Sequence, residues 1–171
     1  MSKQAIEPLI KTMASELNDL IQSGQLNQPA LIGIHTGGVW VAERLHSLLG
    51  LSEPSGTLDI SFYRDDFTRI GINPQVKPSK LPFSLDDRDI ILVDDVLYTG
   101  RTVRAAMNEL FDYGRPAKIV LAVLIDRGGR ELPLQASVVG KQLSLADDEQ
   151  VKLSGPEPLE YEIQKASGNT S

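Results

Sequence analysis

The stretch from Asp89 to Leu110, DIILVDDVLYTGRTVRAAMNEL, constrains the fold of this chain more than any other. It opens with four apolar residues, Ile90–Val93, a continuous run typical of a strand buried on both faces in a parallel sheet. Apolar residues then recur at helical spacing over Val103–Leu110, with alanines between them. The stretch therefore predicts a strand, a turn and a helix, the repeating unit of an α/β fold.

The junction between this strand and this helix carries two polar features. Asp94 and Asp95 follow the strand, and the turn Tyr98–Thr102 opens the helix. The start of a helix offers unpaired backbone N–H groups and a positive dipole end, and Gly100 lets backbone approach a phosphate closely. Two carboxylates nearby would repel a bare polyphosphate, so the ligand must also offer hydrogen-bond donors.

A sugar phosphate satisfies both features. The two carboxylates can accept hydrogen bonds from two ribose hydroxyls, while the threonine and glycine turn holds a 5-phosphate. A bound Mg²⁺ would reduce the charge repulsion further. Taken separately, the two features have an ordinary alternative, since acids can end a strand and Thr99 or Gly100 can cap a helix. Their combination after a wholly apolar strand favours the ligand site.

The segment Val93–Thr102, VDDVLYTGRT, is similar to the phosphoribosyl pyrophosphate motif of type I phosphoribosyltransferases. It resembles most closely the form found in the pyrimidine operon attenuation protein and uracil phosphoribosyltransferase family. The resemblance implies an α/β fold with a central, mostly parallel sheet flanked by helices, a small hood and a flexible lid loop, all in one domain over residues 1–171. It implies that ribose and 5-phosphate contact Asp94, Asp95, Val96, Leu97, Tyr98, Thr99, Gly100, Arg101 and Thr102.

A second strand, turn and helix unit lies earlier in the chain. The apolar run Ala30–Ile34 is followed by His35–Gly38 and then by helical spacing over Val39–Leu49. The turn is a candidate anion cradle, although a plain tight turn is the alternative. The resemblance implies that His35, Thr36, Gly37 and Gly38 hold pyrophosphate. The family often has K-T-R-G here, so His35 and Gly37 leave more of this contact to backbone N–H groups.

A long polar segment follows the alternating residues Leu58 to Tyr63, which predict a strand with one buried face. A structureless segment of this length is typical of a lid or a disordered loop. The resemblance implies a lid, about residues 64–82, that keeps water from an oxocarbenium-like transition state. Arg64, just past the strand, is the predicted catalytic residue of this segment. The other predicted catalytic residues are Asp94 and Asp95 of the acid pair.

A third candidate loop follows the buried strand Lys118–Ile125 and reads Asp126–Pro133, DRGGRELP. Loops at the carboxyl ends of parallel strands share one rim of the sheet, which is where open α/β sheets bind ligands. The DRG-x-RELP pattern is a further match to the family and implies that Asp126, Arg127 and Gly128 border uracil. The alternative is a surface turn with a weak ion pair between Arg130 and Glu131.

The remaining elements follow from local patterns. Apolar spacing over Ala5–Ser23 predicts an amphipathic first helix, and Ala136–Lys141 reads as a short strand. The segments Val151–Leu153 and Leu159–Ile163 are expected to pair with each other. The tail, about residues 164–171, is expected to be disordered.

Composition excludes several classes of site. The 171 residues include no cysteine and two histidines, which excludes a disulfide framework, a thiolate nucleophile and a cysteine-ligated metal, and argues against a histidine site. A net charge of -6 opposes general nucleic-acid binding. The chain has no apolar run long enough to span a bilayer and no signal-peptide pattern, so we expect a cytoplasmic protein.

The resemblance implies a uracil phosphoribosyltransferase that converts uracil and phosphoribosyl pyrophosphate into UMP and pyrophosphate. Mg²⁺ is expected to arrive with the substrate, with Asp94 or Asp95 as a possible ligand. The family also implies homo-oligomers, and an RNA-binding attenuator of pyrimidine operons that senses UMP. Its candidate RNA contacts are Lys11, Arg127, Arg130 and Lys141. An RNA regulator with little enzyme activity, or a transferase for another base such as hypoxanthine, remain the alternatives.

Overall fold

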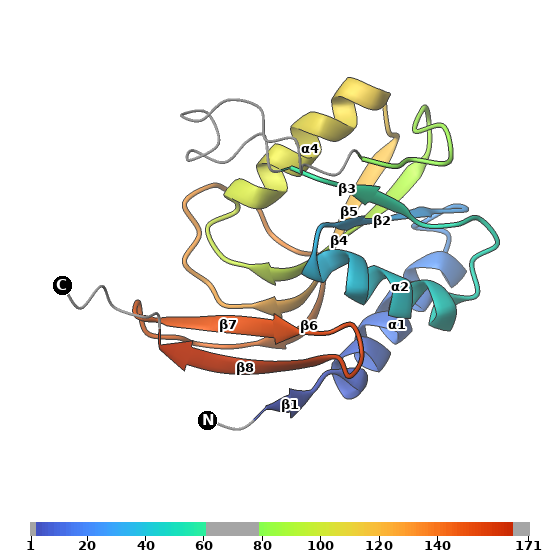
Figure 1. The fold of residues 1–171 in the computed structure, drawn as a ribbon. Helices are drawn as coiled ribbons and strands as arrows, with labels where there is room; N and C mark the ends of the chain where they lie inside the picture. Colours follow the sequence, from blue (N-terminus) through green and yellow to red (C-terminus); the bar gives the residue numbers. More distant parts are fainter. Residues whose placement is uncertain (1–2, 61–78, 166–171) are drawn as a thin grey trace.

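A computed structural model describes residues 3–60 and 79–165 of the chain (Figure 1). Its centre is a five-stranded parallel sheet in the order β3-β2-β4-β5-β6. These strands are β2 (Ala30–Ile34), β3 (Gly56–Leu58), β4 (Asp89–Leu97), β5 (Lys118–Asp126) and β6 (Val138–Gln142). The predicted fold class, a mostly parallel sheet flanked by helices, is confirmed.

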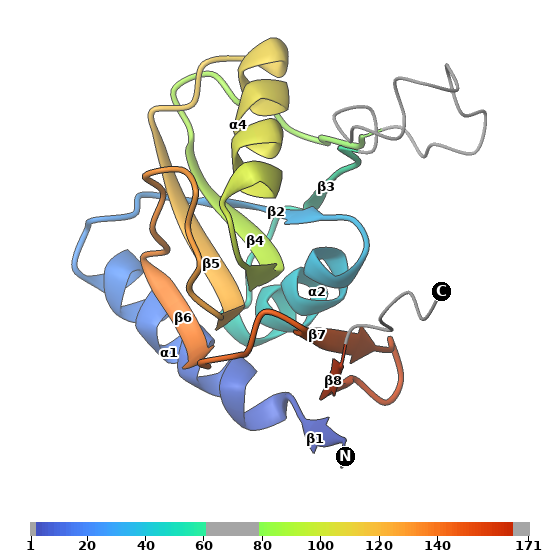
Figure 2. The ribbon, with the colours of Figure 1, turned by 90° about the vertical axis from the view of Figure 1, so that its left-hand side faces the viewer.

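Three helices cover the two faces of this sheet. Helices α1 (Glu7–Gln22) and α2 (Gly37–Leu49) lie on one face, and α4 (Arg101–Tyr113) lies on the other (Figure 2). Gly50, with φ of 64°, ends α2 in the left-handed conformation that favours glycine. Helix α2 begins two residues before the predicted Val39, because the two glycines of the preceding turn already adopt helical geometry.

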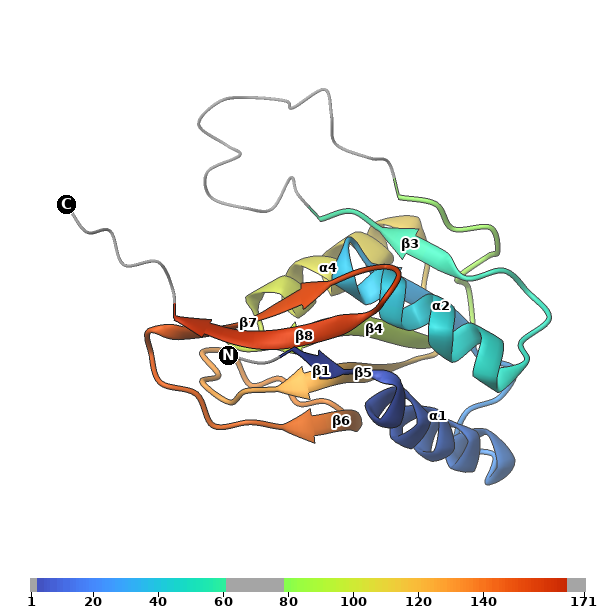
Figure 3. The ribbon, with the colours of Figure 1, turned by 60° about the horizontal axis from the view of Figure 1, so that its bottom comes forward.

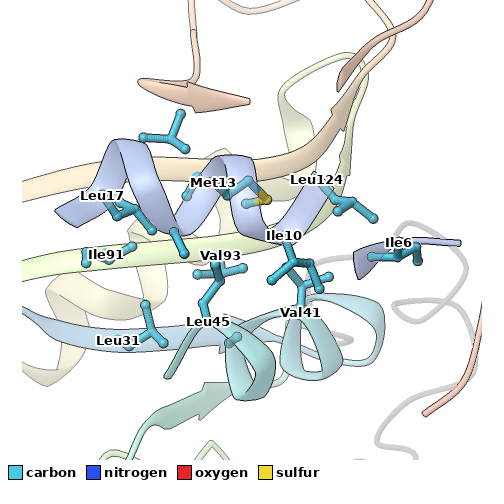
Figure 4. Close-up of a cluster of buried hydrophobic side chains, with 14 of the residues drawn as sticks. Ile6, Ile10, Met13, Leu17, Leu31, Val41, Leu45, Ile91, Val93 and Leu124 are labelled. Atoms are coloured by element: carbon cyan, nitrogen blue, oxygen red, sulfur yellow. The ribbon is translucent and has the colours of Figure 1, made fainter. Parts of the chain in front are cut away.

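The core is divided in two by β4. Ile91 and Val93 pack with α1 and α2, whereas Ile90 and Leu92 pack with α4, and all four side chains are fully buried. Figure 4 shows side chains of α1 and α2 meeting β4 on the first of these faces. This two-sided burial is why the strand reads as an uninterrupted apolar run rather than as an alternation.

Strand β4 continues through the acid pair, although the sequence predicted that the acids follow the strand. Asp94 pairs with Val123 of β5, and pairing continues to Leu97, opposite Asp126. Backbone pairing does not depend on side-chain polarity, so the ladder runs to the edge of the sheet with the two acids inside it. The acids are therefore held by a central strand rather than by a loop.

A second, antiparallel sheet of three strands lies beside the carboxyl edge of the first (Figure 3). It pairs β7 (Glu149–Ser154) with β8 (Glu160–Lys165), and β8 with β1 (Gln4–Ala5). The predicted pairing of the two late segments is confirmed, whereas β1 had no local signal. We call this the small sheet; it is the candidate hood.

The strand predicted over Leu58 to Tyr63 needs correction. Strand β3 ends at Leu58, and Asp59 is buried like its neighbours Leu58 and Ile60, so the predicted alternation of buried and exposed residues is wrong there. The chain at Ser79 and Lys80 crosses over this segment: Thr57 and Lys80 exchange backbone hydrogen bonds, and the backbone N–H of Asp59 donates to Ser79 Oγ (3.1 Å).

The ends of two other predicted segments also differ. Gln164 and Lys165 belong to β8, so the prediction of a disordered tail from about residue 164 is wrong for these two residues. Residues 166–171, and residues 61–78 with Arg64 and most of the predicted lid, lie outside the described residues. Within the described ranges, no helix is both long and apolar enough to cross a membrane.

Candidate active site

Three turns meet at the carboxyl edge of the large sheet. Strands β2, β4 and β5 run parallel, so the residues that follow them, His35–Gly38, Tyr98–Thr102 and Arg127–Pro133, emerge at the same edge, on the side of the small sheet (Figure 2). The sequence predicted this convergence, because loops at the carboxyl ends of parallel strands share one edge of the sheet. The arrangement places all three predicted binding segments side by side.

Glycines bring the start of α2 directly against the acid pair. A Cβ atom on Gly37 would lie 2.8 Å from Asp95 Cγ, and one on Gly38 would lie 2.6 Å from the carbonyl oxygen of Val93 and 3.0 Å from Asp94 Cα. Contacts this short do not occur, so only glycine permits this approach. The structure therefore gives these glycines a packing role, in addition to the predicted backbone donors.

The two acids differ in burial and share one bonding pattern. Asp94 is 5% exposed and Asp95 is half-buried. The backbone N–H of Asp95 donates to Asp94 Oδ1, and the backbone N–H of Val96 donates to Asp95 Oδ1, each at 2.8 Å. These bonds fix both carboxylates against their own strand, with Asp95 turned toward the N-terminus of α2.

The turn before α4 has the geometry of an anion site. Gly100 precedes the helix with φ of 95°, a conformation that favours glycine. Thr99 Oγ1 accepts a hydrogen bond from the backbone N–H of Arg101 (3.2 Å), while Thr102 lies exposed on the first helical turn. The helix dipole and the remaining N–H groups of the first turn favour an anion here.

The loop after β5 braces this turn. The backbone N–H of Glu131 donates to the carbonyl oxygen of Thr99 (2.9 Å), and Arg130 Nη1 donates to that of Tyr98 (2.9 Å). Arg101 Nε donates to Glu131 Oε1 at 2.8 Å. The alternative of an Arg130–Glu131 ion pair is wrong, because Glu131 pairs with Arg101 and Arg130 pairs with Asp126 (2.6 Å).

The carboxylate of Asp126 is held by its own loop. Burial alone would raise its pKa, but the hydrogen bonds from Arg130 and from the backbone N–H of Gly128 (2.9 Å), with the charge of Arg130, outweigh burial. The pKa of Asp126 is therefore lowered. Both carboxylate oxygens already accept hydrogen bonds, so this residue shapes the loop as well as bordering the site.

Arg127 connects the turn Tyr98–Thr102 to the small sheet. Its guanidinium carbon lies 3.9 Å from the centre of the Tyr98 ring, a cation–π contact. Its Nη1 donates to the carbonyl oxygen of Glu149 (2.9 Å), where β7 begins, and Nη2 donates to that of Ala146 (3.4 Å). The Nε atom is buried, and no partner for it lies among residues 3–60 and 79–165. Gly129 fits against Tyr98, whose Cδ1 is 2.9 Å from the site of an added Cβ.

A cavity of about 830 Å³ opens beside these residues. The predicted residues Asp126, Arg127 and Gly128 line it, together with Arg130, Leu132 and Pro133 of the same predicted loop. The other lining residues, which sequence reasoning missed, are Leu134, Gln135, Gln142, Leu143 and Ser144. Gln142 ends β6, and Leu143 and Ser144 follow it. These residues carry no pattern that marks a site, so only the pairing of β6 with β5 reveals them.

The structure separates the other predicted residues. The Leu97 side chain is buried in the core, so only its backbone faces the site. Lys11 on α1 and Lys141 on β6 are exposed, whereas Arg127 and Arg130 are engaged in the contacts described above. Arg64 lies outside the described residues.

Metal binding at this site would depend on the ligand. Within the described ranges, no group of three or more histidine, aspartate or glutamate side chains could hold a metal ion. Asp94 and Asp95 supply hard oxygen donors of the kind Mg²⁺ prefers, and Mg²⁺ commonly binds through one or two carboxylates plus substrate phosphates. The acid pair therefore fits a metal carried by a phosphate ligand, and does not form a closed metal site.

Comparison with known proteins identifies the family. The phosphoribosyl transferase domain matches residues 2–160. The chain is similar to "Bifunctional protein PyrR" of Nitrosococcus oceani, with 63% identity over 161 residues, 93% of this chain and 91% of that protein. It is also similar to the protein of the same name from Pseudomonas aeruginosa, with 57% identity over 154 residues, 90% of this chain and 91% of that protein.

A solved structure supports the fold. The hypoxanthine phosphoribosyltransferase of Staphylococcus aureus aligns with a TM-score of 0.62 at 20% identity, over 86% of this chain and 78% of that one. At this identity the likeness concerns the fold alone. The family predicted from the sequence is confirmed: the chain belongs to the phosphoribosyl transferase domain family and, within it, to the PyrR proteins.

Proposed function

We propose that this protein is a uracil phosphoribosyltransferase, which makes UMP and pyrophosphate from uracil and phosphoribosyl pyrophosphate. One observation carries the proposal: the acid pair of β4 lies between two helix N-termini, those of α2 and α4, at one edge of the sheet. Two anion sites thus flank two carboxylates, which can accept hydrogen bonds from hydroxyls. This arrangement matches a ribose with phosphate groups at both ends. The PyrR relatives support the assignment.

Each part of the substrate has a candidate partner. The turn Tyr98–Thr102 would hold the 5-phosphate, and Asp94 and Asp95 would accept hydrogen bonds from the ribose hydroxyls. The turn His35–Gly38 would hold the pyrophosphate, chiefly through backbone N–H groups. Positioning and charge stabilisation then supply most of the rate, and no covalent nucleophile is needed.

We place uracil in the cavity beside the loop after β5. Its imide edge needs both donors and acceptors, and the side-chain amides of Gln135 and Gln142 offer both. The side chains of Leu132 and Leu134 add apolar surface next to the phosphate turn.

Mg²⁺ would enter with phosphoribosyl pyrophosphate. Asp95 is the better candidate ligand within the acid pair, because it is half-buried and turned toward the pyrophosphate turn, whereas Asp94 is 5% exposed. Bound there, the ion would neutralise charge on the departing pyrophosphate. The carboxylates of Asp94 and Asp95 would orient the ribose without help from the ion.

A base screen tests the assignment. Purified protein is incubated with phosphoribosyl pyrophosphate, Mg²⁺ and uracil, cytosine, hypoxanthine or guanine in turn, and nucleotide products are quantified. We expect UMP and pyrophosphate in equal amounts, and no other nucleotide at a comparable rate. Turnover of hypoxanthine without turnover of uracil would overturn the substrate assignment.

In Asp95→Asn we expect kcat/KM to fall by about 100-fold or more with an unchanged melting temperature.

A second activity, UMP-dependent binding of pyrimidine-operon leader RNA, is supported by the word "bifunctional" in the names of the relatives. Of the four candidate RNA contacts, Lys11 and Lys141 have exposed side chains available to phosphates. Gel-shift titration with a leader RNA, with and without UMP, tests this role. We expect UMP to strengthen the shift and Lys141→Gln to weaken it. Absence of any UMP-dependent shift at moderate salt would remove the regulatory role.

A further inference from the structure

We propose that Arg44 is a positioning residue, which fixes the small sheet to α2 and thereby sets the place of the hood relative to the pyrophosphate turn. The proposal rests on the proposed function, because the small sheet is joined to the proposed uracil cavity through Arg127, which lines that cavity and binds the start of β7. Within the described part of the chain, the hydrogen-bond partners of Arg44 are Glu7, Pro156 and Glu157, which lie outside the predicted binding turns.

The Arg44 guanidinium joins three parts of the fold. Its Nη2 atom donates to the carbonyl oxygen of Pro156 and to Glu157 Oε2, each at 3.0 Å, in the turn between β7 and β8. Its Nη1 atom donates to Glu7 Oε1 at the start of α1. The fork of an arginine can satisfy several acceptors at once, which a lysine cannot do in the same geometry.

Trp40 packs against the same turn. Trp40 and Arg44 are four residues apart, so they lie on one face of α2. A Cβ atom on Gly155 would lie 3.2 Å from Trp40 Cε3 and 2.8 Å from Leu159 Cδ1, so the turn rests closely on the indole. Leu159 and Tyr161 of this hairpin are buried in the core that α1 and α2 share.

The hairpin is thus attached at both ends of β7. Arg127, stacked on Tyr98, holds the entry to β7, while Trp40 and Arg44 hold its exit; Figures 1 and 3 both place the β7–β8 turn beside α2. One end is thereby connected to the predicted phosphate turn, and the other to the helix that begins at the predicted pyrophosphate turn. The position of the hood depends on both.

The test compares Arg44→Gln with the matched control Glu7→Gln. The first variant loses the contacts to the β7–β8 turn, and the second loses only the ion pair to α1. We expect Arg44→Gln to raise the KM for uracil about fivefold while kcat and the KM for phosphoribosyl pyrophosphate stay within about twofold, the pattern of lost binding without lost chemistry. Glu7→Gln should match the wild type.

Trp40 is the only tryptophan of the chain, so its fluorescence reports on the turn without any assay of turnover. We expect a red-shifted emission maximum in Arg44→Gln, because the turn no longer covers the indole, and no shift in Glu7→Gln. This measurement tests the role of Arg44 separately from the proposed function. If the protein does not use uracil, the proposed function fails, but the emission shift in Arg44→Gln is still expected. An unshifted emission in Arg44→Gln, or a shift with an unchanged KM for uracil, would overturn the positioning role.

Discussion

The carboxylate carbon of Asp95 lies 2.8 Å from the point that a Cβ atom on Gly37 would occupy. The proposed ribose acceptor, Asp95, therefore lies directly against the proposed pyrophosphate turn, although one belongs to β4 and the other follows β2. A bound diphosphate would meet the Asp95 carboxylate directly, which is a physical reason for a bridging cation. The contact also makes Gly37 a sensitive test of the site.

Gly37→Ala is expected to impair the site while sparing the fold. The added methyl group meets the carboxylate of Asp95, the end of a side chain that can rotate, so the acid moves away from its position. We expect kcat/KM for phosphoribosyl pyrophosphate to fall about 10- to 100-fold, since small misplacements are costly in a positioned site. Steady-state kinetics checks this, with exposed Ser47→Ala on the same helix as control. Wild-type kinetics in Gly37→Ala would contradict the close contact between Gly37 and Asp95.

Gly38→Ala is expected to damage the fold instead. Here the methyl group would meet backbone, the carbonyl oxygen of Val93 at 2.6 Å and Asp94 Cα at 3.0 Å, and backbone in a central strand cannot move aside. Such overpacking typically costs about 1–3 kcal/mol of unfolding free energy. Urea denaturation measures this loss. Equal stability of Gly38→Ala and Gly37→Ala would show that α2 can slide on the sheet.

Asp126 should make the folded protein sensitive to acid. Its pKa is lowered in the folded state, so its contribution to stability is present above the ordinary aspartate pKa of 3.8 and is lost as pH falls through the folded pKa. We expect Asp126→Asn to be less stable than wild type at pH 7, with the difference shrinking below about pH 4. Melting temperatures from pH 3 to 7 test this. A constant difference would mean that the Arg130 pair does not control the loop.

Glu109 on α4 should act in the opposite direction. Burial raises its pKa, the hydrogen bond from Ser79 Oγ (2.8 Å) opposes this, and the charges of Asp59 and Asp112 raise it further. A raised folded pKa contributes stability that is present below the ordinary glutamate pKa of 4.5 and is lost as pH rises through the folded pKa.

The variant Glu109→Gln keeps an acceptor for Ser79 but carries no charge. It is expected to match the wild type below pH 4.5 and to become the more stable of the two as pH rises toward 8. Thermal unfolding across this range, with exposed Glu16→Gln as control, checks the expectation. A pH-independent difference would show that the charge of Glu109 is not the cause.

Much of the large sheet could be predicted because its signals are local. Strand Ala30–Ile34 was predicted at its observed bounds, and β5 differs from its prediction only by the addition of Asp126, since buried parallel strands read as apolar runs. The turns before α2 and α4 were also predicted, because a glycine turn between a strand and a helix is a pattern within a few residues.

The rest depends on contacts between distant residues. Strand β1 has two residues and exists only because it pairs with β8 at the other end of the chain. The partners of Arg130 and Glu131 are set by how the loop folds over Thr99, which no spacing encodes. The cavity wall at residues 142–144 likewise arises from the pairing of β6 with β5.

A crystal structure of the protein with UMP tests the central claim most directly, because the claim is an assignment of each part of the ligand to one turn. We predict the phosphate within hydrogen-bond distance of the Thr99–Thr102 backbone, the ribose hydroxyls on Asp94 and Asp95, and the uracil ring in the cavity lined by Asp126 and Gln142. A phosphate bound at His35–Gly38, or a ribose without contact to either acid, would contradict the account.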